Sequence, residues 1–146
     1  MTSAGVATTS SFFAGLNSIS EAELDSLPYG AIQLDRQGTV LRYNVFEAGL
    51  SGLTRQKVVG KNFFKQIAPC TDLPQFYGRF RDGVAAGELH CTFRFHFAFE
   101  QRPCDVTVTL FYDERDKTTW VLVQPFEGKT TEEIWGRRWT AGPRFH

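Results

Sequence analysis

Cys70 is the residue of this 146-residue chain whose surroundings most favour chemistry. It follows Pro69 directly, and a proline biases the residue before it toward an extended backbone, so we expect the thiol to lie on a loop. A helix is predicted shortly downstream, and the N–H groups and dipole at a helix N-terminus favour a nearby thiolate. Cys70 could therefore be a nucleophile, an attachment point for a small molecule, or a buried and inert thiol.

Cysteine hydrolase and zinc chemistry find little support. The chain has three histidines, His90, His96 and His146, and neither His96 nor His146 is placed as a base beside Cys70. No C-x-x-C or H-x-x-x-H spacing occurs, and phosphate loops and dinucleotide fingerprints are absent. We take Cys91 and Cys104 as structural and predict that the protein is not an enzyme.

The amino-acid composition further limits which classes of protein this chain can belong to. The formal net charge is +0, so no global field attracts nucleic acid or an anionic membrane. Fourteen phenylalanines indicate a dense core or a pocket lined by aromatic rings. No run of about 18 apolar residues is present, and no signal-peptide pattern opens the chain. Three cysteines are too few for a disulfide framework, so we expect a cytoplasmic protein.

The first half alternates strand and helix patterns around the cysteine. Ser20 and Glu23 form a capping box, which predicts a short helix over 21–26. Residues 30–35 and 39–43 are predicted to form a hairpin, and short helical turns are expected between residues 44 and 67. The main helix is predicted over 73–87, where Phe76, Phe80 and Val84 recur four residues apart and Gly87 supplies a stop.

The second half has the period of strands. Apolar and polar residues alternate over 91–99 and 106–111, and residues 118–123 follow a polar turn. The expected class is therefore α+β, with a five-stranded antiparallel sheet and helices packed on one face. We divide the chain into an N-terminal cap (1–27), one folded domain (28–126) and a C-terminal extension (127–146).

Eight motifs resemble one known family. They are GAIQLD (30–35), YN (43–44), Glu47, VGKNFFK (59–65), APCTD (68–72), FYG (76–78), GVA (83–85) and WV (120–121). Together they resemble the photoactive yellow protein family of blue-light photoreceptors, which has the PAS fold. The resemblance runs without gaps from about Leu24 to Val123, and the VGKNFFK and APCTD motifs are highly specific in combination.

The resemblance implies a covalent chromophore. A 4-hydroxycinnamoyl (p-coumaroyl) group would be joined to Cys70 as a thioester, and blue light would drive its trans-to-cis isomerisation. Tyr43 and Glu47 match the pair that holds the phenolic oxygen, and Ser51 matches a hydroxyl that supports the tyrosine. Burial raises the pKa of a carboxyl group, so Glu47 could remain neutral and donate a proton to the phenolate. The buried carboxylate left behind gives a physical reason for partial unfolding.

The resemblance also implies which residues line the pocket. They are Leu53, Gln101, Phe97, Ile32, Phe63 and Ile67. Two of these depart from the family pattern: Leu53 stands where an arginine is usual, and Gln101 where a methionine is frequent. We expect both changes to alter the colour or the recovery from bleaching.

Simpler interpretations compete with each assignment. Taken alone, Cys70 is more often a buried inert thiol, Tyr43 a strand-end aromatic and Glu47 a solvated loop acid. Only their joint occurrence in matching contexts favours the photoreceptor. The alternative is a chromophore-free PAS module that senses a small ligand or mediates an interaction. In either case we expect an unidentified signalling partner, and neither nucleic acid nor a membrane.

Overall fold

The computed structural model describes residues 15–98 and 104–125. The predicted pocket residue Gln101, the first 14 residues of the predicted cap and the predicted extension over 127–146 lie outside these described residues.

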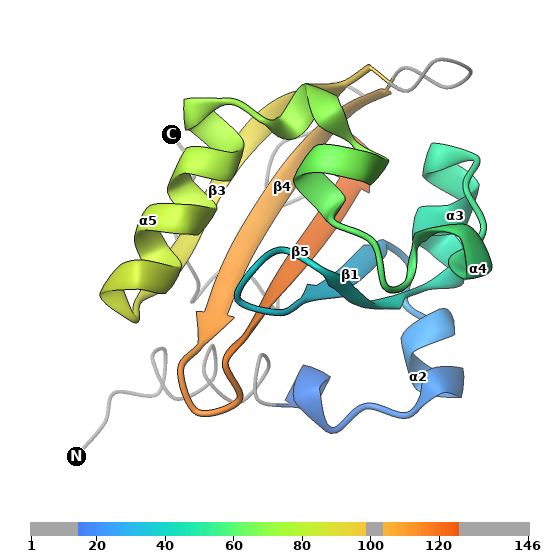
Figure 1. Cartoon of the computed structure of the whole chain (residues 1–146). Coiled ribbons are helices and arrows are strands. Elements are labelled where there is room, and N and C mark those ends of the chain that lie inside the picture. Colours follow the sequence, from blue (N-terminus) through green and yellow to red (C-terminus); the bar gives the residue numbers. More distant parts are fainter. Residues whose placement is uncertain (1–14, 99–103, 126–146) are drawn as a thin grey trace.

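A five-stranded antiparallel sheet forms the centre of the domain (Figure 1), as predicted. Its strands are β1 (Gly30–Leu34), β2 (Val40–Tyr43), β3 (Leu89–Phe97), β4 (Cys104–Asp113) and β5 (Thr118–Pro125). They lie in the order β2-β1-β5-β4-β3, so the N-terminal hairpin and the C-terminal three strands meet where β1 pairs with β5. The pairing of β1 with β5 thus joins the N-terminal hairpin and the three C-terminal strands into one continuous sheet.

Short helices connect the two halves of the sheet. They are α2 (Glu21–Asp25), α3 (Val45–Ser51), α4 (Arg55–Val58), a π-helical turn (Phe63–Ile67), a 3₁₀ turn (Pro69–Thr71), a second π-helical turn (Pro74–Gly78) and α5 (Arg79–Ala86). The single helix predicted over 73–87 is thus a π turn followed by α5. Gly87 ends α5 with a φ of 78°, the left-handed conformation that glycine adopts without strain.

Helical segments cover both faces of the sheet, so the prediction that helices pack on one face is wrong. On one face α3 packs on β1, α4 on β2, and α5 on β3 and β4. The opposite face holds a second apolar cluster formed by Leu16, Leu24, Tyr29, Ala31, Trp120 and Leu122. The second cover is needed because every residue of β1 is buried, as are the first six of β5, and such strands expose neither face to water.

Asn17 joins this second cover to the sheet by hydrogen bonds. Its Oδ1 accepts from Trp120 Nε1 at 2.7 Å, and its Nδ2 donates to Asp113 Oδ2 at 2.7 Å. Residues 15–17 form a helical turn, so a short local element positions this side chain. The segment before α2 is therefore bonded to β4 and β5, which lie about 100 residues further along the chain.

The phenylalanine row predicted on β3 faces the main core. Phe95 and Phe97 are buried, whereas His96 between them is exposed and contacts Asp105 at 2.7 Å. Phe76 reaches this row from the second π turn, with its ring centroid 5.1 Å from that of Phe95. The rings meet edge to face, the arrangement favoured by the aromatic quadrupole.

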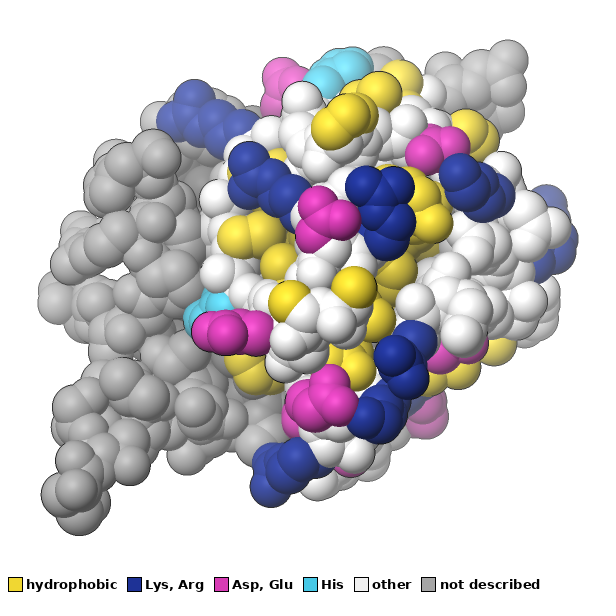
Figure 2. Space-filling view, turned by 60° about the vertical axis from the view of Figure 1, so that its left-hand side comes forward, with side chains coloured by type: hydrophobic (Ala, Val, Ile, Leu, Met, Phe, Trp, Pro, Cys, Tyr) yellow, Lys and Arg dark blue, Asp and Glu magenta, His cyan; other side chains and the backbone are white. Residues whose placement is uncertain are grey.

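Acidic and basic side chains are interspersed over the face seen in Figure 2, in keeping with the zero net charge. Among the described residues, no helix is long and apolar enough to cross a membrane.

Candidate functional site

Cys70 lies in the 3₁₀ turn between the two π turns, so the predicted loop is a short ordered turn. The turn is closed by a hydrogen bond from the Thr71 hydroxyl to the Ala68 carbonyl oxygen at 2.6 Å. The Cys70 thiol is half-buried, and its Sγ accepts a contact from the Ala98 N–H at 3.5 Å, just past the end of β3. The sulfur is thus held between the turn and the edge of the sheet.

Tyr43 and Ser51 form the first polar pair of the site. Tyr43 ends β2, Ser51 ends α3, and their hydroxyl oxygens lie 2.6 Å apart in a buried position. The Leu53 N–H donates to Ser51 Oγ at 3.0 Å, which fixes the serine. Burial raises the pKa of Tyr43, and the nearby Glu47 carboxylate raises it further, so the phenol retains its proton.

Glu47 brings a carboxyl group into the interior. Its side chain lies in the first turn of α3 and is 1% exposed, and Oε1 has no hydrogen-bond partner among the described residues. Burial raises its pKa from 4.5 to about 8, so the group is neutral at pH 7. The interpretation of Glu47 as a solvated loop acid is therefore excluded.

Asn44 explains why this acid turns inward. In a capping box, the acid three residues after the N-cap reaches back to the N-cap N–H. Here Asn44 caps α3 by accepting from the Glu47 N–H at 3.0 Å, but the Asn44 N–H already donates to the Ala31 carbonyl oxygen at 3.1 Å. The Glu47 carboxyl group is consequently not needed at the helix end. The sequence pattern that indicates this arrangement is an asparagine three residues before a glutamate.

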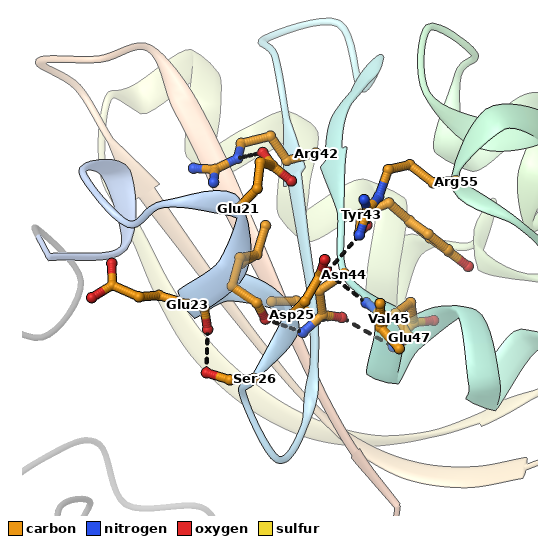
Figure 3. A network of polar contacts seen from close by, with 12 residues as sticks. Glu21, Glu23, Asp25, Ser26, Arg42, Tyr43, Asn44, Val45, Glu47 and Arg55 are labelled. Carbon is orange, nitrogen blue, oxygen red and sulfur yellow. Dashed lines mark hydrogen bonds and ion pairs between the residues drawn. The ribbon is translucent and has the colours of Figure 1, made fainter.

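Asn44 also connects three elements around the site (Figure 3). Its Oδ1 accepts from the Ala31 N–H at 3.0 Å, and its Nδ2 donates to the carbonyl oxygens of Leu24 at 2.9 Å and Tyr29 at 3.0 Å. The side chain therefore bonds α2, the start of β1 and α3 to one another.

Arg55 adds a second connection beside it (Figure 3). It donates from Nε to the Tyr43 carbonyl oxygen at 2.8 Å and forms an ion pair with Asp25 of α2. The pair is partly exposed, so we assign it at most about 1 kcal/mol. Arg55 acts mainly by positioning these elements, because its two contacts connect the end of β2 to α2.

Replacing Asn44 by alanine is expected to lower the free energy of unfolding by about 3 kcal/mol. The change removes a helix cap and the buried hydrogen bonds from Asn44 to the Ala31 N–H and to the carbonyl oxygens of Leu24 and Tyr29. Urea unfolding measures the loss. Asn62→Ala is the matched control, because Asn62 caps the first π turn at the surface and should cost about 1 kcal/mol. Equal losses for the two variants would contradict the assignment.

The structure brings the predicted site residues into one region. Ile32, Tyr43, Phe63 and Phe97 belong to the main apolar core, and Leu53, Ile67 and Cys70 pack against it half-buried. Phe63 and Phe97 meet edge to face with centroids 6.4 Å apart. Gln101 cannot be placed, since it lies outside the described residues.

A buried phenol fits these residues. A phenolic oxygen in an apolar core needs hydrogen-bond donors, and a neutral carboxyl group with an unpartnered oxygen and a protonated tyrosine supply them. A half-buried thiol that packs against the same core is available for covalent attachment. The donor set thus suits a mostly apolar group with one polar end.

Comparison with known sequences shows the family of the chain. The family described as PAS fold matches residues 20–125 of the chain. The photoactive yellow protein of Rhodothalassium salexigens is 46% identical over 104 residues, which cover 71% of this chain and 83% of that protein. The photoactive yellow protein of Halochromatium salexigens is 41% identical over 109 residues, covering 75% and 87%.

Solved structures agree as well. The photoactive yellow protein domain from the sensor histidine kinase Ppr of Rhodospirillum centenum has a TM-score of 0.72 and 41% identity, covering 75% of this chain and 96% of that domain. The PAS domain of an HTR-like protein from Haloarcula marismortui, at 16% identity and a TM-score of 0.58, covers 80% and 99% and shares the fold alone. The resemblance found in the motifs is confirmed: this chain belongs to the photoactive yellow protein family, and its fold is the PAS fold.

Proposed function

We propose that the protein is a blue-light photoreceptor that carries a p-coumaroyl group as a thioester on Cys70. The observation that carries the proposal is the placement of two proton-bearing groups, Tyr43 and Glu47, in the same apolar core that Cys70 adjoins. The names of the relatives support it, because they are photoactive yellow proteins. The protein acts as a sensor and not as an enzyme.

The bound group would supply light absorption and isomerisation, and the chain would supply attachment, orientation and a proton. Cys70 would attach the group through its thiolate, and Tyr43, supported by Ser51, would donate to the phenolic oxygen. Glu47 holds a proton at its buried carboxyl group, and after isomerisation it would transfer that proton to the phenolate oxygen, which leaves a carboxylate at Glu47 and a neutral phenol. A buried carboxylate without a partner costs several kcal/mol, which loosens α3 and the elements bonded to Asn44.

Signal output follows from this loosening. Asn44 and Arg55 bond the site to α2, so a charge at Glu47 weakens the attachment of the N-terminal segment. The related domain from Rhodospirillum centenum belongs to a sensor histidine kinase, and we propose that this chain likewise acts on a signalling protein.

The test is reconstitution with activated p-coumarate. We expect a yellow protein whose visible band bleaches in blue light and recovers in the dark. A colourless product that nevertheless folds would favour the alternative, a PAS module that binds another small ligand or a protein without a chromophore.

Gln101→Met is expected to change the dark recovery rate of the bleached band. An amide forms hydrogen bonds that a thioether cannot form, and we place residue 101 in the pocket by its resemblance to the family. Leu53, half-buried against the core, leaves that part of the pocket apolar where a cation is usual. Flash photolysis compares the variant with the parent, and indistinguishable rates would discard the role of Gln101.

A further inference from the structure

Gly30 lies directly beneath the Glu47 carboxyl group. It begins β1, is buried, and pairs with Val123 of β5. A Cβ built at residue 30 would lie 2.1 Å from Glu47 Oε1 and 3.2 Å from Glu47 Cδ. The first distance is far inside van der Waals contact, so no side chain can occupy residue 30 while the acid keeps its position.

The backbone does not require glycine here. Gly38, Gly52, Gly60 and Gly87 have positive φ angles, but Gly30 does not. Alanine could adopt the conformation of residue 30 without backbone strain, and its Cβ would be 3.2 Å from Val123 Cβ, a tight contact that requires a shift of a few tenths of an ångström. The most severe conflict is with the Glu47 carboxyl group.

We propose that Gly30 is a positioning residue for the buried acid: its missing side chain creates the niche in which the Glu47 carboxyl group lies. Asn44 frees the acid from the helix end, and Gly30 gives it a place against the sheet. The consequence for a bound phenol rests on the proposed function, because the niche sets where the acid's proton is offered.

The expected effect of Gly30→Ala is a change in how Glu47 titrates. Displacing the carboxyl group from its niche moves it toward water or toward the Tyr43 hydroxyl, and both environments stabilise the carboxylate. Burial raises the pKa of Glu47 to about 8. Among the described residues, Tyr43 of β2 is the titratable group that interacts electrostatically with Glu47.

Infrared titration of the full chain without chromophore tests the proposal. The parent should show a protonated-carboxyl band that Glu47→Gln abolishes, and Gly30→Ala should increase its acid dissociation constant by about tenfold or more. Gly49→Ala is the matched control, because Gly49 lies on α3 with nothing within 4 Å of a new Cβ. A folded Gly30→Ala protein with the parent's band and midpoint would overturn the proposal.

A double variant keeps the test decisive if Gly30→Ala alone does not fold. In a Glu47→Ala background the new Cβ no longer meets the carboxyl group, so adding Gly30→Ala should change the unfolding equilibrium constant by no more than about threefold. A double variant as unstable as Gly30→Ala alone would show that the glycine acts through the sheet and would overturn the proposal.

The two proposals can fail independently. Neither the infrared titration nor the double variant requires a chromophore, so a colourless protein would reject the photoreceptor and leave these results to decide on Gly30. If the protein is yellow, Gly30→Ala should shift its visible maximum, whereas Gly49→Ala should not.

Discussion

Cys70→Ser is expected to abolish the visible band after treatment with activated p-coumarate, and intact-mass spectrometry should find no added p-coumaroyl mass on the variant. A serine hydroxyl has no accessible oxyanion at neutral pH, so it cannot displace the activating group as a thiolate does. The substitution is nearly isosteric at a half-buried position, and the free energy of unfolding should change by less than about 1 kcal/mol. Absorbance, mass and urea unfolding are measured on the same preparations.

Cys91→Ser provides the matched control. Cys91 is also a free, half-buried thiol, but it lies on β3, and burial raises its pKa. The variant should retain the full added mass and a band that bleaches and recovers as in the parent. Loss of label in Cys91→Ser with retention in Cys70→Ser would show that the attachment point is misassigned.

Glu47→Gln is expected to remove a pH dependence from the free energy of unfolding of the protein without chromophore. The folded state holds the Glu47 proton with a pKa of about 8, against an ordinary value of 4.5, so it binds the proton more tightly than the unfolded state. The stability that Glu47 contributes is therefore fully present below about pH 4.5 and is lost as the pH rises through about 8. The parent should lose roughly 1 kcal/mol per pH unit relative to the variant across this window.

The measurement is the difference between the two unfolding free energies, taken in urea from pH 5 to pH 8.5. The difference is needed because His90 titrates in the opposite sense. Burial lowers its pKa to about 4, so its contribution is present above the ordinary value of 6.5 and is lost as the pH falls. This term is common to both proteins and cancels. A difference that stays constant with pH would mean that Glu47 is ionised in the folded protein at neutral pH.

Much of the fold follows from local patterns. The alternation of phenylalanines on β3 and the capping box before α2 depend on neighbours a few residues apart, and the structure contains both. The split of the predicted main helix was missed because Pro74 is tolerated in a first helical turn, and periodicity does not distinguish a π turn from an α turn. The cover on the second face was missed because burial on both sides of a strand is a property of the sheet.

The sequence by itself determined the family and named Cys70, Tyr43 and Glu47, because residue types and spacing are local properties that specific motifs preserve. Only the tertiary structure decided that Glu47 is buried and neutral, since its pKa depends on how completely the surrounding chain excludes water. It also decided why the acid points inward. The Asn44 N–H is already hydrogen-bonded to the Ala31 carbonyl oxygen, and Gly30 leaves space for the Glu47 carboxyl group. Both Ala31 and Gly30 belong to β1, more than ten residues away in the sequence.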